Sequence, residues 1–201
     1  HGSDIESKFT SFGALLHSVA TGSIAPLKGR YVVALWRSGK RLPRRQELPP
    51  SAFYTVEELE QTLRSCQAVW PAEEALERFG ALCVALCYRW LSPAEADTDR
   101  WHLGRVARMA GSYLQATCAS THAGLRAAAQ PTLAEAPDFA LFWDVASIRM
   151  PSDRAPASSS AAEREAFEDA QRLSAIWYGH AHTVLWVQPE LPDDFVLDHA
   201  S

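Results

Sequence analysis

The residues Ala81-Leu-Cys-Val-Ala-Leu-Cys87, followed by Tyr88-Arg-Trp90, form the segment from which the fold is best predicted. A short and nearly unbroken apolar run predicts a strand that is buried on both faces, as is typical of a parallel sheet. Two further runs, 139–143 and 183–187, have the same character and are separated by helix-length connections. This alternation predicts an α/β fold in which the three runs are adjacent parallel strands, with helices on both faces of the sheet.

The first 80 residues predict a helix-strand-helix extension. An amphipathic helix is expected to end near Gly22, and Tyr31–Trp36 predicts a strand because it is rich in β-branched and aromatic residues. Capping boxes, in which a glutamate follows three residues later, are expected at Ser3, Thr55 and Ser160. Helices are expected at 55–66, 72–79, 101–114 and 160–178. We therefore predict that residues 1–80 pack on a main α/β domain formed by residues 81–201.

Composition limits the class of protein. The formal net charge of -5 argues against a general binder of nucleic acid, and no segment approaches the roughly 20 apolar residues that span a membrane. Cys83 and Cys87 would lie roughly 13 Å apart on one strand, too far for a disulfide. Reduced thiols, and therefore a cytoplasmic location, are the simplest expectation.

Two groups of polar residues have a pattern that a metal site would need. His180 and His182 would share one face of a strand, and Glu95, Asp97 and Asp99 supply carboxylates on a single loop. No third ligand accompanies the histidines, and the acidic loop lacks the spacing of an EF-hand. Capping histidines and solvated acids are the favoured interpretations, so we expect no metal site.

The order of these motifs resembles a known family. Tyr88-Arg-Trp-Leu91 ends the first strand, His102-Leu103 opens a helix, Leu141-Phe-Trp-Asp144 ends the second strand, and Thr183-Val-Leu-Trp-Val187 forms the third. The whole is similar to a divergent Toll/interleukin-1 receptor (TIR) domain, particularly to the TIR-like domains of protist and algal proteins. This resemblance implies a flavodoxin-like sheet and a signalling or assembly role through homotypic protein contacts.

The chain also departs from the TIR pattern. Cys87 stands where the usual motif has a serine, and the helix that carries the catalytic glutamate of enzymatic TIR domains, near a Trp-Cys pair, is not found. Because the sequence ends at Ser201, soon after the third strand, we expect either a domain truncated at its C-terminus or one that lacks this machinery.

The ends of the first two strands contain the residues to examine for chemistry, because ligands of open α/β sheets bind there. For cleavage of NAD, Asp144 is the best-placed carboxylate and Glu190 is a second acid nearby. Trp90 and Trp143 offer stacking surfaces, and the guanidinium of Arg89 suits a pyrophosphate. The alternative is structural: an ion pair between Arg89 and Asp144, with both tryptophans in the core.

Two oppositely charged loops suggest a surface for assembly. The loop Arg37–Arg45 contains five cations and the loop Ser92–Arg100 contains three acids. Head-to-tail contacts between copies would bring these loops together. Alternatively, Arg44, Arg45 and Gln46 lock the N-terminal segment onto the sheet within one molecule.

Two functions therefore remain open from the sequence. The first is a TIR-like signalling or assembly module that binds a protein partner or further copies of itself. The second is a toxin-like NAD hydrolase, with NAD as its substrate and a nucleotide pocket at the carboxyl ends of the strands.

Overall fold

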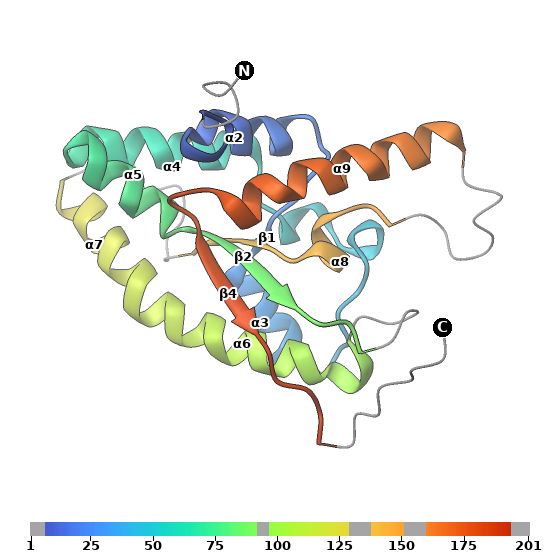
Figure 1. Ribbon diagram of the computed structural model, residues 1–201. Coiled ribbons are helices and arrows are strands. Elements are labelled where there is room, and N and C mark those ends of the chain that lie inside the picture. Colours follow the sequence, from blue (N-terminus) through green and yellow to red (C-terminus); the bar gives the residue numbers. More distant parts are fainter. Residues whose placement is uncertain (1–6, 92–96, 129–137, 151–159, 194–201) are drawn as a thin grey trace.

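The computed structural model describes residues 7–91, 97–128, 138–150 and 160–193, and its centre is a four-stranded sheet in the order β1-β3-β2-β4 (Figure 1). The strand β2 (Cys83–Tyr88) lies between β3 (Ala140–Phe142) and β4 (Val184–Gln188) and is parallel to both. The three apolar runs are thus adjacent parallel strands, as predicted. The sheet also contains a strand that was not predicted, because the two-residue strand β1 (Leu27–Lys28) pairs with β3 antiparallel.

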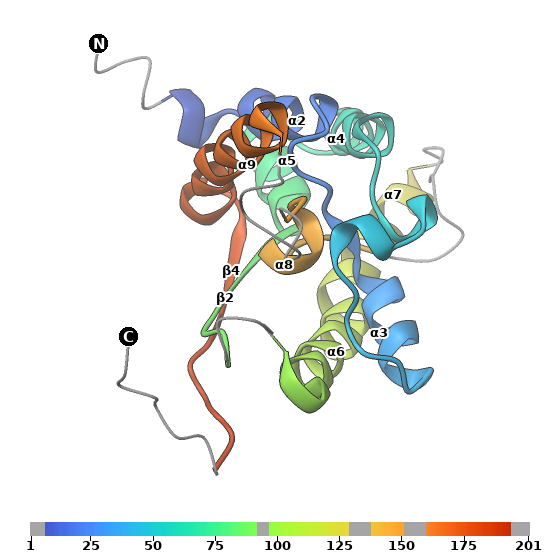
Figure 2. The same ribbon diagram turned by 90° about the vertical axis from the view of Figure 1, so that its right-hand side faces the viewer.

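The sheet is covered on both faces, and each face has its own apolar core. Alternate residues of β2 point to opposite sides: Val84 and Leu86 belong to one core, and Cys83 and Ala85 to the other. The first core includes α3 (Gly29–Arg37) and α6 (Trp101–Tyr113). The second includes α2 (Phe12–Ala20), α4 (Val56–Val69), α5 (Ala72–Gly80) and α9 (Ala161–Gly179). Figure 2 shows the second group of helices at the top of the view and α3 and α6 below.

The segment predicted as a strand at Tyr31–Trp36 is the helix α3, so that prediction was wrong. Val32 and Leu35 are buried at helical spacing, and α3 packs against α6 at Gly104, where an added Cβ would lie 2.9 Å from the Trp36 ring. Because intrinsic propensity is a weak preference, this tertiary packing overrides the β-branched composition.

The first predicted helix is interrupted at Ser11. Residues 7–10 are helical, Ser11 interrupts the helix, and its hydroxyl accepts a hydrogen bond of 3.2 Å from the Gly13 amide to begin α2. Gly22, with φ +73°, lies just beyond the helix end. The capping box predicted at Ser3 falls outside the described residues, whereas those at Thr55 and Ser160 are confirmed.

The four other predicted helices, at 55–66, 72–79, 101–114 and 160–178, are present as α4, α5, α6 and α9. The helix α6 continues through a π-helical turn, Leu114–Cys118, into α7 (Ala119–Ala127), and the short helix α8 (Asp144–Ser147) follows β3 directly. Within the parts of the chain that are described, no helix has the length and apolar character needed to cross a membrane.

Candidate functional site

Asp144 connects the carboxyl ends of β2 and β3. It is the first residue of α8, and its carboxylate accepts hydrogen bonds from the Tyr88 hydroxyl at 2.8 Å and from Trp90 Nε1 at 3.1 Å. The Val145 amide also donates to it, at 2.6 Å. The side chain therefore accepts hydrogen bonds from three donors at two strand ends, and these bonds fix its orientation.

This environment acts on Tyr88 in turn. Burial, followed by the negative charge of Asp144, raises the pKa of the Tyr88 hydroxyl far above its usual value. The phenol thus stays protonated at neutral pH and serves as a hydrogen-bond donor. The sequence pattern singled out Asp144 but gave Tyr88 no role, although a hydroxyl donor at the end of the neighbouring strand was a usable signal.

The residues predicted to hold a nucleotide are placed differently from one another. Trp143 is completely buried, packs edge-on to Tyr88 and belongs to the core on the α6 side. Trp90 is half-buried beside Asp144, and Arg89 is exposed. No ion pair between Arg89 and Asp144 is found among the described residues, so the predicted alternative pairing is replaced by the Tyr88 and Trp90 contacts.

Glu190 contacts a different element. Its carboxylate forms an ion pair with the Arg105 guanidinium at 2.9 Å, and that guanidinium also lies 4.2 Å from the Trp101 ring centroid. Because the Glu190 side chain is 62% exposed, the pair contributes little to stability. The structure thus places Glu190 beside α6 rather than with the donors of Asp144.

The acid at position 97 caps the helix α6. The carboxylate of Asp97 accepts hydrogen bonds from the backbone amides of His102, at 2.6 Å, and Leu103, at 3.1 Å. Asp97 is buried, so its interpretation as a solvated acid was wrong. Glu95 falls outside the described residues. His102 is also buried, its Nε2 lies 2.9 Å from the Arg89 carbonyl oxygen, and burial lowers its pKa.

The two charged loops contact each other within one molecule. Arg41 forms an ion pair with Asp99 at 3.6 Å. The Arg45 guanidinium donates hydrogen bonds to the carbonyl oxygens of Gly22, Ser23 and Ser147, and Gln46 donates to the Met150 carbonyl. The predicted internal role is therefore confirmed for Arg45 and Gln46.

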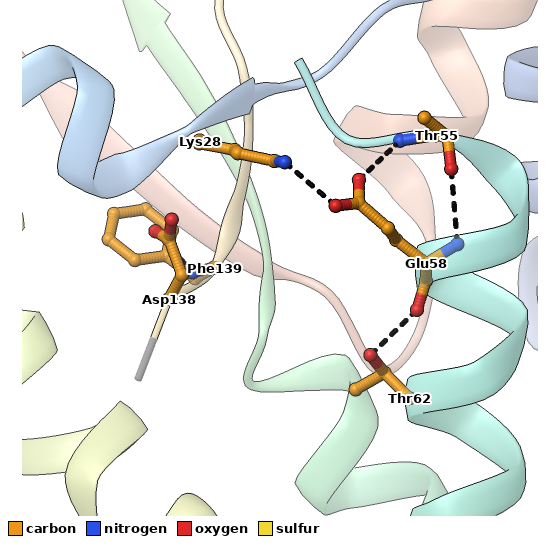
Figure 3. A network of polar contacts seen from close by, with 6 residues as sticks. All are labelled: Lys28, Thr55, Glu58, Thr62, Asp138 and Phe139. Atoms are coloured by element: carbon orange, nitrogen blue, oxygen red, sulfur yellow. Dashed lines mark hydrogen bonds and ion pairs between the residues drawn. The ribbon is translucent and has the colours of Figure 1, made fainter. Parts of the chain in front are cut away.

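A polar network near β1 joins the predicted capping box of Thr55 and Glu58 to Lys28, a contact that the sequence did not predict (Figure 3). The ammonium of Lys28 contacts the Glu58 carboxylate at 2.7 Å, and the same glutamate closes the capping box of α4. Asp138 precedes β3 and accepts a hydrogen bond from the Arg30 amide, which caps α3 from a distant part of the chain. Burial raises the pKa of Asp138. These contacts stabilise helix ends, and no local sequence motif marks Asp138 as a cap.

The histidine pair lies where α9 leads into β4. His180 is buried and stacks on the Phe12 ring at 4.5 Å, and its Nδ1 accepts a hydrogen bond from the His182 amide. This is the predicted capping and turn role. Among the described residues, no group of three or more His, Cys, Asp or Glu side chains is arranged to hold a metal ion.

Comparison of the chain with family models, with curated proteins and with solved structures finds no match.

Proposed function

We propose that this chain is a TIR-like assembly module that acts by binding other protein chains, including copies of itself. The observation that carries the proposal is the outer strand β4, which pairs with β2 on one side and with no strand among the described residues on the other. Its Leu185 and Val187 side chains are 47% and 59% exposed. Exposed apolar side chains on an unpaired strand are a typical site of association with another chain.

The strand order supports the TIR-like part of the proposal. Taken in chain order, β2, β3 and β4 are arranged with the first in the middle, the second on one side and the third on the other. The flavodoxin-like order 2-1-3-4-5 begins in the same way. This order is consistent with the family resemblance of the motifs.

Contacts through the charged loops receive less support. Arg41 and Asp99 already pair within the molecule, and Arg45 is used to hold three backbone carbonyl groups. Replacing Arg45 with glutamate would disturb the fold rather than report on a surface. We therefore assign association to the apolar strand edge and not to a head-to-tail contact of these loops.

Sedimentation velocity over a range of protein concentrations tests the proposal. We expect the weight-average sedimentation coefficient to rise with concentration and to change little with salt, since the contact is mainly apolar. A coefficient that remains that of a monomer at the highest concentration would contradict self-association.

NAD hydrolysis is a second candidate function, because Asp144 and the half-buried Trp90 lie at the carboxyl ends of parallel strands. Against it, the Asp144 carboxylate already accepts three hydrogen bonds and Trp143 is buried. Calorimetric titration with NAD, together with a turnover assay of the wild type and of Asp144→Asn, tests this function. Neither binding nor turnover is expected, and turnover that Asp144→Asn abolishes would establish the enzyme instead.

A further inference from the structure

The edge of β4 lacks the features that usually prevent strand association. Natural edge strands are protected by charged side chains or prolines within the strand, yet Val184–Gln188 contains neither. Proline and charge come only after the strand, at Pro189 and Glu190. The edge is therefore chemically suited to accept another strand.

The exposed residues of β4 lie symmetrically about one position. Leu185 and Val187 are in register with Ala85 and Cys87 of β2, so they lie on the face of the sheet that α9 partly covers. Trp186, between them, points to the opposite face and belongs to the core beside α6. An antiparallel pairing centred on Trp186 places each Leu185 opposite the Val187 of a second strand.

We propose that two copies of this chain pair antiparallel through β4, about a twofold axis at Trp186, and so join their sheets into one. This inference rests on the proposed function and names its partner and its contact. In this arrangement the two Leu185 and two Val187 side chains form one apolar cluster, because directly opposed residues of antiparallel strands share a face.

Other registers fit the same edge less well. A pairing centred on Leu185 sets Val187 opposite Thr183, and one centred on Val187 sets Leu185 opposite Pro189. A slip by a single residue would place the exposed Leu185 opposite Trp186, whose side chain lies on the other face. Only the pairing about Trp186 sets both exposed side chains opposite apolar residues of the strand itself, since Pro189 lies beyond its end and has no amide hydrogen to donate.

The surroundings of the strand are compatible with a second copy. Continued past the strand ends, the register sets His182 opposite Glu190 of the second copy, so like charges do not face each other. On the α6 face, a hollow beside Trp186 is also lined by Arg108, Met109 and Tyr113, which leaves room for side chains of the second strand. A pairing of two five-residue strands buries less surface than the roughly 1,200–2,000 Å² of a standard interface. The dimer is therefore expected to be weak and concentration-dependent.

Disulfide trapping distinguishes the registers. Because Cys87 is in register with Val187 within one molecule, Cys87→Ser is the background for all variants. Leu185→Cys and Val187→Cys proteins are prepared separately, mixed, oxidised and analysed on non-reducing gels. Directly opposed residues have Cα atoms about 4.5–5.5 Å apart, within the range that a disulfide spans.

We expect a covalent dimer in the mixture and little in either protein alone. Ala34→Cys, on the exposed surface of α3, is the matched control and should stay monomeric after mixing with either variant. In sedimentation, Leu185→Lys should weaken the dimer by about tenfold or more, because the ammonium group would have to be buried beside Val187.

Other outcomes overturn the inference in distinguishable ways. A covalent dimer of Val187→Cys alone or Leu185→Cys alone would contradict the register about Trp186. Reversible association of the Cys87→Ser protein without any trapped dimer would overturn the pairing through β4, whereas self-association through another surface would stand. A strict monomer at high concentration would contradict both this dimer and the self-association of the proposed function.

Discussion

The Tyr88 hydroxyl donates a hydrogen bond of 2.8 Å to the Asp144 carboxylate across 56 positions of the chain. The bond fixes the carboxyl ends of β2 and β3 to each other at the edge of the sheet where an α/β protein usually binds its ligand. The Asp144 carboxylate, held by Tyr88, Trp90 and the Val145 amide, is oriented toward the protein. The same contacts that make Asp144 conspicuous thus give it a structural role.

A double-mutant cycle measures this relationship. Tyr88→Phe and Asp144→Asn should each lower the free energy of unfolding by about 1–3 kcal/mol, because each removes or weakens a hydrogen bond to a charged group. The double variant should lose less than the sum, by about 1 kcal/mol or more, since the two residues act as one unit. Urea denaturation gives all four values, and losses that simply add would contradict the pairing.

The sheet was predictable because its signal is local. Each of the three parallel strands is largely apolar, as is typical of a parallel sheet, and the helices between them follow from capping residues and spacing. The strand β1 gave no such signal, because two residues are too short to show a period.

The misassigned helix and the site contacts depend on partners far away in the chain. Helix α3 is fixed by Gly104 of α6 and capped by Asp138, and neither can be read from residues 29–37. Likewise, the sequence placed Asp144 and Trp90 at strand ends correctly but could not show that they bond to each other. Such pairings are set by side-chain directions in the folded sheet.

Arg45 should be the most important cation of its loop for stability. Its guanidinium donates to the carbonyl oxygens of Gly22 at 2.7 Å, Ser23 at 2.9 Å and Ser147 at 3.2 Å. Burial, and then the nearby charge of Arg149, lowers its pKa to about 10, so it remains charged at neutral pH. Arg45→Met should cost about 1–3 kcal/mol, because carbonyl groups would lose a charged donor.

The exposed Lys40 of the same loop provides the control for Arg45. Lys40→Met should change the unfolding free energy by less than about 0.5 kcal/mol, as is usual for surface positions. Arg45→Lys should lie between the two, because an ammonium group cannot reach several carbonyl groups in the way that a planar guanidinium does. Equal effects of Arg45→Met and Lys40→Met in chemical denaturation would disprove the internal role.

Two helical glycines should respond in opposite directions to alanine. A Cβ at Gly80, the last residue of α5, would lie 2.2 Å from the His182 backbone oxygen, so Gly80→Ala must displace the connection that leads into β4. Gly111 lies inside α6 with no atom within 4 Å of such a Cβ. Gly111→Ala should raise stability by about 0.5–1 kcal/mol through helix propensity, whereas Gly80→Ala should lower it. Thermal melts of both variants check the contrast, and a stabilised Gly80→Ala would refute the close approach.

His180 should make the fold sensitive to mild acid. Its ring is buried against Phe12, and burial is the main cause that lowers its pKa, with a smaller contribution from His182 and an opposing one from the Ser11 backbone. The unfolded chain, with a histidine pKa of about 6.5, then binds more protons than the folded protein just below that pH. The contribution of His180 to the free energy of unfolding should be fully present above about pH 6.5. It should be lost as the pH drops toward the lowered pKa of the folded state.

Urea midpoints measured between about pH 8 and pH 5 test this pH dependence. His102, whose pKa is also lowered by burial, acts in the same direction, so His180→Gln should reduce the slope without removing it. The exposed His17 is the control, and His17→Gln should leave the slope unchanged. Because loss of the Phe12 contact lowers stability at every pH, the slope rather than the absolute value is the informative quantity. A wild-type midpoint that stays constant over this range, or a slope that His180→Gln leaves intact, would show that the imidazole titrates equally in the folded and unfolded states.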